Sequence, residues 1–115
     1  MKNKFVLATL LIASSFSYSV LANNAEDNYK HFCWQCHGMK ADGMGLNVQD
    51  MSVQPRDHSS AKAMGGRSDE DLFTVIKKGG LAIDKSVLMP PWGDSLSDDE
   101  IHDLVKYLRE LCKCG

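Results

Sequence analysis

Apolar residues recur at helical spacing in three segments of the chain, and no stretch alternates apolar and polar residues as a strand does. The clearest segment follows Ser97, which has Glu100 three residues later, the pattern of a capping box. Its apolar positions lie three or four residues apart from about Asp98 to Leu111. The pattern predicts an all-α fold that ends in an amphipathic helix.

The other two predicted helices flank a long loop. The first starts at Asn24 and runs into a pair of cysteines, and the second starts after Ser68 and ends before Gly79 and Gly80. Between them, residues 38–66 contain five glycines and one proline without an apolar period, which predicts a loop. A loop of this length in a small domain is either functional or a solvated insertion.

Residues 1–22 are expected to be a cleaved signal peptide that precedes one domain, residues 23–115. Two lysines precede an apolar stretch, a Ser-rich segment follows, and the small residue Ala22 ends it. The apolar stretch is shorter than the ~20 residues that span a bilayer. The sequence therefore predicts a soluble periplasmic protein without stable membrane insertion, with a retained anchor as the alternative.

The expected mature domain is acidic. The leader holds two of the 13 basic residues and none of the 15 acidic ones. The mature domain therefore keeps 11 basic and 15 acidic residues, a net charge of −4. This balance argues against nucleic acid as a partner.

Cys33, Cys36 and His37 form a CxxCH motif, which is the most informative pattern in the chain. Two thiols one helical turn apart can form thioether bonds with the vinyl groups of a haem, and the adjacent imidazole can then bind the iron. The motif predicts covalent attachment of one haem c. A thioredoxin-like dithiol and a structural metal site are the alternatives, because both also use CxxC.

A haem iron with one His ligand needs a second axial ligand for electron transfer, and Met89 is the predicted one. It precedes Pro90 and Pro91, which restrict the backbone on one side. A thioether raises the potential of the iron relative to a second His. Four other methionines are expected to fill the core, with the last of them as the main competitor: Met39, Met44, Met51 and Met64. Three histidines are expected to be solvated: His31, His58 and His102.

Residues 25–111 resemble the class I cytochromes c, specifically the small bacterial proteins with a single haem. The CxxCH motif, the Met89-Pro90-Pro91-Trp92 run and the final helix carry the resemblance. It implies thioether bonds at Cys33 and Cys36, axial ligation by His37 and Met89, and terminal helices that cross. In that crossing the family pattern places these residues together: Ala25, Tyr29, Leu104, Tyr107 and Leu108.

The predicted function is electron transfer by a monomeric periplasmic carrier that cycles its haem between Fe(III) and Fe(II), with redox proteins as donor and acceptor. No other part of the sequence resembles a catalytic constellation, so we do not expect an enzyme. Two alternatives stay open. One is a haem-binding small subunit of a larger oxidoreductase, and the other is a haem sensor or enzyme with a displaceable sixth ligand.

The chain departs from the family pattern at its end, where Cys112 and Cys114 flank Lys113. Two cysteines in an oxidising compartment are usually paired. Residues i and i+2 of a helix face different ways, so a mutual bridge is expected to require that the helix end by Leu111. A local disulfide is slightly favoured. Bridges to another molecule through either cysteine, and free thiols with a redox or metal role, are the alternatives.

Overall fold

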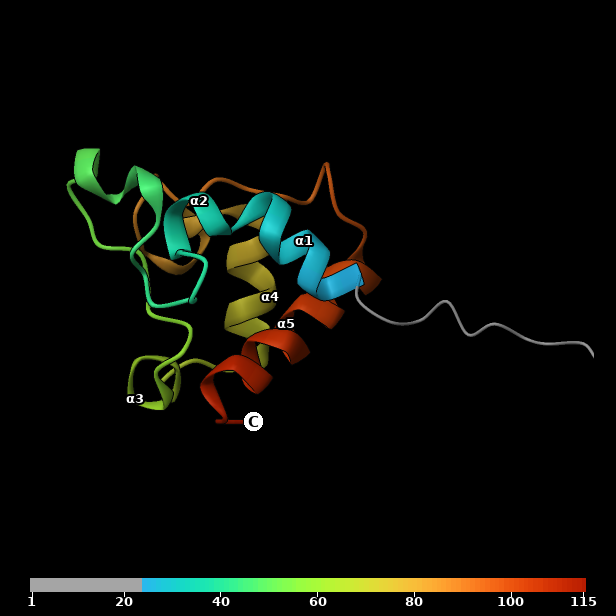
Figure 1. Cartoon of the computed structure of the whole chain (residues 1–115). Helices are drawn as coiled ribbons and strands as arrows, with labels where there is room; N and C mark the ends of the chain where they lie inside the picture. The colour runs from blue at the N-terminus through green and yellow to red at the C-terminus, as the bar shows by residue number, and fades with distance from the viewer. Residues whose placement is uncertain (1–23) are drawn as a thin grey trace, which may run out of the picture.

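The computed structural model describes residues 24–115, and within this range the chain is helical and has no strand (Figure 1). The predicted signal peptide, residues 1–22, lies outside the described residues. The elements in chain order are α1 (Asn24–Phe32), α2 (Trp34–His37), the 3-10 turn η1 (Leu46–Asp50), α3 (Ala61–Met64), α4 (Asp69–Lys78), the 3-10 turn η2 (Gly80–Ile83) and α5 (Asp98–Cys112). The predicted all-α fold is confirmed.

None of the helices between residues 24 and 115 combines the length and the apolar character that crossing a membrane requires.

Capping chemistry sets the start of the two longer helices. The Ser97 Oγ accepts from the Glu100 N–H at 3.3 Å, and the Glu100 carboxylate accepts from the Ser97 N–H at 2.9 Å. The predicted capping box of α5 is therefore present. The helix α4 begins after Ser68 in the same way, with Asp71 in the position of the glutamate. The predicted N-caps Ser68 and Ser97 are both confirmed.

The terminal helices α1 and α5 cross, with α4 packed beside them (Figure 1). Tyr29 of α1 is 1% exposed, and its ring meets that of Tyr107 edge-on with 5.5 Å between centroids. At the other end of the crossing, the side-chain amides of Asn24 and Asn28 donate to the Glu100 carboxylate at 3.3 and 3.4 Å. The crossing of the terminal helices implied by the resemblance is thus observed.

The core lies between α4 and α5. Every third or fourth residue of α5 is buried, as its apolar period predicts, and α4 contributes two buried residues of its own. The loop also contributes Met64, which has no exposed surface. The buried core residues of these helices are Leu72, Ile76, Ile101, Leu104, Val105, Leu108 and Cys112.

The predicted loop, residues 38–66, contains η1 and α3 and folds back on the CxxCH motif. The Gly45 N–H donates to the Cys36 carbonyl at 3.1 Å. A Cβ at Gly45 would overlap the carbonyl group of Gln35 and lie 2.6 Å from the Cys36 carbonyl carbon. The close approach explains why glycine occupies this position, and it makes the loop a structural part of the motif's surroundings.

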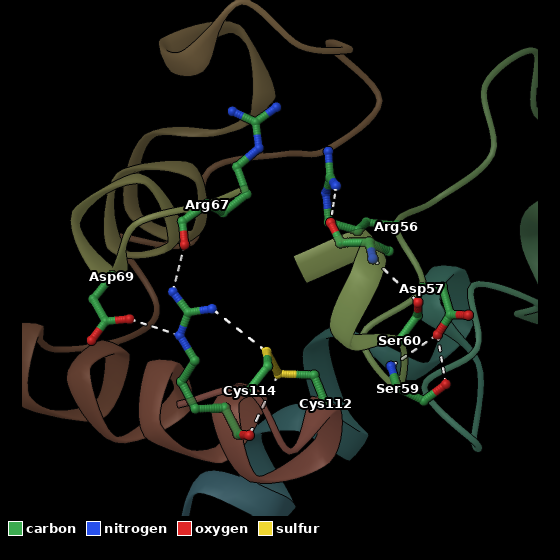
Figure 2. The surroundings of a disulfide bond; sticks show 10 residues. Arg56, Asp57, Ser59, Ser60, Arg67, Asp69, Cys112 and Cys114 are labelled. Carbon is green, nitrogen blue, oxygen red and sulfur yellow. Dashed lines mark hydrogen bonds and ion pairs between the residues drawn. A yellow bond between two sulfur atoms is a disulfide. The ribbon is translucent and has the colours of Figure 1, made fainter. Parts of the chain in front are cut away.

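At the end of α5, Cys112 and Cys114 form a local disulfide with 5.2 Å between their Cα atoms (Figure 2). The helix includes Cys112, so the expectation that it must end by Leu111 is wrong. Lys113 has a left-handed backbone with φ of 52°, which turns the chain back so that the two sulfurs meet.

Candidate functional site

A cavity of about 910 Å³ is lined by residues from both halves of the described chain. Cys33, Cys36 and His37 line it from the α1–α2 region, and Met89 lines it from the loop before α5. Its volume falls among those of ligand and cofactor sites, about 300–1,000 Å³. The structure thus brings all four predicted site residues together around one space.

His37 is 8% exposed, and its ring is held by the main chain of the long loop. Its Nδ1 lies 2.9 Å from the Arg56 carbonyl oxygen, which can only accept, so Nδ1 carries the proton and donates. The Nε2 atom is then the nitrogen with a free lone pair. Burial lowers the pKa of His37, and this favours the neutral imidazole that binds metals.

The Arg56 carbonyl is a functional group that the sequence does not reveal. A backbone oxygen carries no residue signature, and its place opposite His37 depends on how residues 38–66 fold back. A carbonyl in this position fixes the tautomer and the orientation of a metal-binding histidine.

Cys33 and Cys36 are both free thiols in the structure. Burial raises the pKa of the Cys33 thiol to about 12, and the charge of Cys36 acts in the same direction. A thioredoxin-like dithiol needs an accessible thiolate near neutral pH, so this environment argues against that alternative. Residues 24–115 also contain no group of three or more His, Cys, Asp or Glu side chains placed to hold a metal ion.

Main-chain hydrogen bonds to the end of α4 fix the segment that carries Met89. The Gly80 N–H donates to the Met89 carbonyl at 2.9 Å. The Trp92 N–H donates to the Ile76 carbonyl at 2.9 Å, and the next residue donates to the next carbonyl of α4 at 3.1 Å. The last carbonyls of a helix have no partner within it, so this loop satisfies them. These bonds hold the segment in addition to the two prolines.

The other methionines divide in a way that the sequence did not predict. Met64, the expected competitor, is fully buried in the core and is not among the residues that line the cavity. Met51 does line it, so the structure makes this residue the sulfur to compare with Met89. Met39 and Met44 are 76% and 65% exposed, and the prediction that they fill the core is wrong.

His58 is 8% exposed, so the prediction that it is solvated is wrong. Its ring stacks on that of His37 with 3.9 Å between centroids and 16° between planes. Its ring Nδ1 lies 2.9 Å from the Tyr29 hydroxyl, and the backbone N–H of His58 donates to the Ala41 carbonyl at 2.7 Å. The buried hydroxyl of α1 supplies the partner that a buried imidazole requires. The two remaining histidines are exposed, as predicted: His31 and His102.

The family model described as cytochrome c oxidase, cbb3-type, subunit III matches residues 21–108. The chain belongs to this cytochrome c family. The cytochrome is also similar to a solved structure, the KustC0563 c-type cytochrome, with a TM-score of 0.60 and 22% identity over 76% of this chain and 95% of that one. At this identity the likeness shows a shared fold. No curated protein sequence matches the chain.

Proteins of this family bind haem c covalently and use its iron in electron transfer. The residues around the cavity fit such a group. They supply two free thiols in a CxxCH motif, an imidazole whose Nε2 has a lone pair, and a partly open cavity with Met89 on its wall. Haem c is therefore the cofactor of this cytochrome.

Proposed function

We propose that this cytochrome is a periplasmic electron carrier whose haem is attached through Cys33 and Cys36 and has His37 and Met89 as axial ligands. The observation that carries the proposal is that these residues, far apart in the sequence, line one cavity while His37 Nδ1 is bound to the Arg56 carbonyl. When bound, the haem supplies a one-electron couple between Fe(III) and Fe(II).

The protein's own groups set the environment of that couple. The Arg56 carbonyl orients His37 and increases its basicity as a ligand. The Met89 thioether is a neutral, soft donor that favours the reduced iron. The buried side chains of Leu72 and Ile76 form part of the cavity wall and keep water away. Exclusion of water and a thioether ligand both favour a higher potential.

Two arginines are available for the carboxylates of the haem. Arg56 and Arg67 both line the cavity, and Figure 2 shows their side chains extending from the two ends of the short segment that contains α3. The Arg56 guanidinium also donates to the Ala63 carbonyl, which holds its stem in place. A planar guanidinium suits a carboxylate partner because it can donate two parallel hydrogen bonds.

If His37 and Met89 both held the iron, a small molecule would have no ready access to it, as the carrier role requires. Redox proteins are the proposed partners of a monomeric cytochrome. A partner at the cavity would meet Val53 and Leu88, which line it and are 48% and 43% exposed, together with Lys85. The signal-like leader and the disulfide at the end of the chain both support a periplasmic location.

The assignment of Met89 is tested by comparing Met89→Ala with Met51→Ala in the haem-loaded protein. The ferric protein should show the near-infrared absorption band of methionine-sulfur ligation. We expect Met89→Ala to abolish this band and lower the midpoint potential, and Met51→Ala to retain both. If Met51→Ala loses the band and Met89→Ala keeps it, the axial assignment is wrong.

Carbon monoxide distinguishes the carrier from a sensor or enzyme. The reduced wild-type protein at neutral pH should not bind carbon monoxide, whereas Met89→Ala should bind it rapidly because one axial position is open. Rapid binding by the wild type would contradict the carrier and support a displaceable sixth ligand.

One observation favours a second function, that of an oxidoreductase subunit: the matched family is described as subunit III of a cbb3-type cytochrome c oxidase. A subunit should co-purify with its complex from native membranes or extracts at moderate salt, whereas a free carrier should elute alone at the size of a monomer.

A further inference from the structure

The Cys112–Cys114 disulfide lies at the end of α5, and neither cysteine is among the residues that line the haem cavity. The bridge encloses a single residue. The stabilisation that a disulfide gives by restricting the unfolded chain grows with the length of the loop it closes, so it is smallest for a loop of this kind. The position of the bridge therefore calls for an explanation other than stability.

The backbone brings the two sulfurs together. The Lys113 N–H donates to the Glu110 carbonyl and the Cys114 N–H donates to the Arg109 carbonyl, both at 3.2 Å. These are the two hydrogen bonds of a Schellman motif, with Lys113 in the left-handed position. Because the main chain makes this turn, reduction of the bridge would leave the two thiols near each other, as reversible exchange requires.

The two sulfurs differ in accessibility. Cys112 is 3% exposed and belongs to the hydrophobic core, whereas Cys114 is partly exposed. Cys114 is therefore the more open of the two cysteines to an external thiolate. The Cys112 thiol would remain in the core after reduction, so exchange does not require α5 to unfold.

A fixed guanidinium lies beside the accessible sulfur. The Arg109 Nη1 is 3.8 Å from the Cys114 Sγ (Figure 2). The same side chain donates from Nε to the Asp69 carboxylate at 2.8 Å and from Nη2 to the Arg67 carbonyl at 2.6 Å. These contacts hold the guanidinium in place. A cation next to a sulfur stabilises its thiolate, which is the form that thiol–disulfide exchange produces.

We propose that the Cys112–Cys114 bridge is a thiol–disulfide exchange site that accepts two electrons from a dithiol protein. A thiolate of the dithiol attacks the Cys114 Sγ, the bond between the two cysteines breaks, and the electron pair leaves on the Cys112 Sγ, which takes up a proton. The second thiolate of the dithiol then attacks its own partner sulfur and expels Cys114 as a thiolate beside Arg109, where it is protonated. The dithiol is oxidised to a disulfide and the cytochrome gains two thiols.

The test incubates the full, folded, haem-loaded protein in mixtures of reduced and oxidised glutathione, followed by an acid quench, removal of glutathione, alkylation in denaturant so that the buried Cys112 thiol also reacts, and intact-mass measurement. The thioether sulfurs cannot be alkylated in this way, so each added label reports Cys112 or Cys114. We expect two labels in reducing mixtures and none after reoxidation. A structural disulfide resists the glutathione pool. If no label is found after incubation of the folded protein at about a hundredfold excess of reduced over oxidised glutathione, the bridge has resisted reduction and the proposal is overturned.

Two variants test Arg109 as a positioning residue. Arg109→Gln should slow reduction about fivefold to tenfold, because the thiolate at Cys114 loses a charged neighbour. Asp69→Asn removes the Arg109–Asp69 ion pair, as Arg109→Gln does, but it keeps the guanidinium. The bridge in Asp69→Asn should therefore be reduced at close to the wild-type rate. Equal rates for Arg109→Gln and the wild type would remove Arg109 from the mechanism.

The haem spectrum separates this proposal from the carrier function. The double variant Cys112→Ser/Cys114→Ser should retain the wild-type spectrum and midpoint potential and take up no label. A bridge inert to glutathione would leave the carrier function standing, and rapid carbon monoxide binding by the wild type would overturn the carrier function but leave the exchange site standing.

Discussion

Replacing Tyr29 with phenylalanine removes one buried oxygen and leaves the ring of α1 in place. The lost hydroxyl lies 2.9 Å from the His58 Nδ1, and the two residues are 1% and 8% exposed. Water cannot readily replace the hydroxyl at such burial. A buried polar group left without a partner costs about 1–3 kcal/mol. We expect the free energy of unfolding to fall by this amount in Tyr29→Phe.

Urea denaturation of the haem-loaded protein measures the change, with an unaltered m-value as the sign that only stability differs. Tyr107→Phe is the matched control, since this tyrosine packs against Tyr29 but is partly exposed. Loss of its hydroxyl should change stability by less than about 0.5 kcal/mol. In the double variant Tyr29→Phe/His58→Leu both polar partners are gone, and the two effects should be non-additive by about 1 kcal/mol or more.

Two results would contradict this expectation: an equal loss of stability in Tyr29→Phe and Tyr107→Phe, or additive effects of the Tyr29 and His58 substitutions. Either result would mean that the buried imidazole does not depend on the hydroxyl for its hydrogen bond.

Two further changes test the loop and the cap of α5. Gly45→Ala places a methyl group against the Gln35 backbone, so it should lower the free energy of unfolding by at least about 1–3 kcal/mol and reduce the yield of covalently attached haem. Gly66→Ala is the control, because a Cβ there has nothing within 4 Å, and it should leave both quantities unchanged. Urea denaturation and haem staining measure the two effects. The Ser97 N–H and hydroxyl, with the Asn28 amide, lower the pKa of Glu100, so its stabilising effect is full above the ordinary pKa of 4.5 and is lost as the pH falls through the lowered value. Glu100→Gln should therefore be less stable than the wild type at pH 7, with a difference that shrinks in acid; a difference independent of pH would contradict the cap's electrostatic role.

The helices could be predicted because their signals are local. Ser97 and Glu100 are three residues apart, so they interact wherever α5 forms. The apolar period of α5 predicts which face of the helix is buried. The end of α5 was less predictable. Lys113 adopts a left-handed conformation that is usual for glycine, so a lysine at this position does not indicate the turn that allows the disulfide.

The site residues that belong to short sequence motifs could be predicted. The CxxCH run and the prolines after Met89 indicated four of the residues that line the cavity. The Arg56 carbonyl and the buried His58 could not be inferred in this way. Both reach His37 only because residues 38–66 fold back on the motif, an arrangement set by contacts distant in sequence.

The attachment of the Met89 segment to α4 has a kinetic consequence. The amides of Trp92 and Gly93 are bonded to carbonyls at the end of α4, and the Met89 carbonyl accepts from Gly80, so the backbone of Met89 cannot leave the cavity wall while these bonds are intact. Large displacement requires local unfolding, in which the amides of Gly80 and Trp92 would become open to hydrogen exchange together. The time for which the backbone of Met89 stays at the cavity wall is thus governed by the fraying of the end of α4.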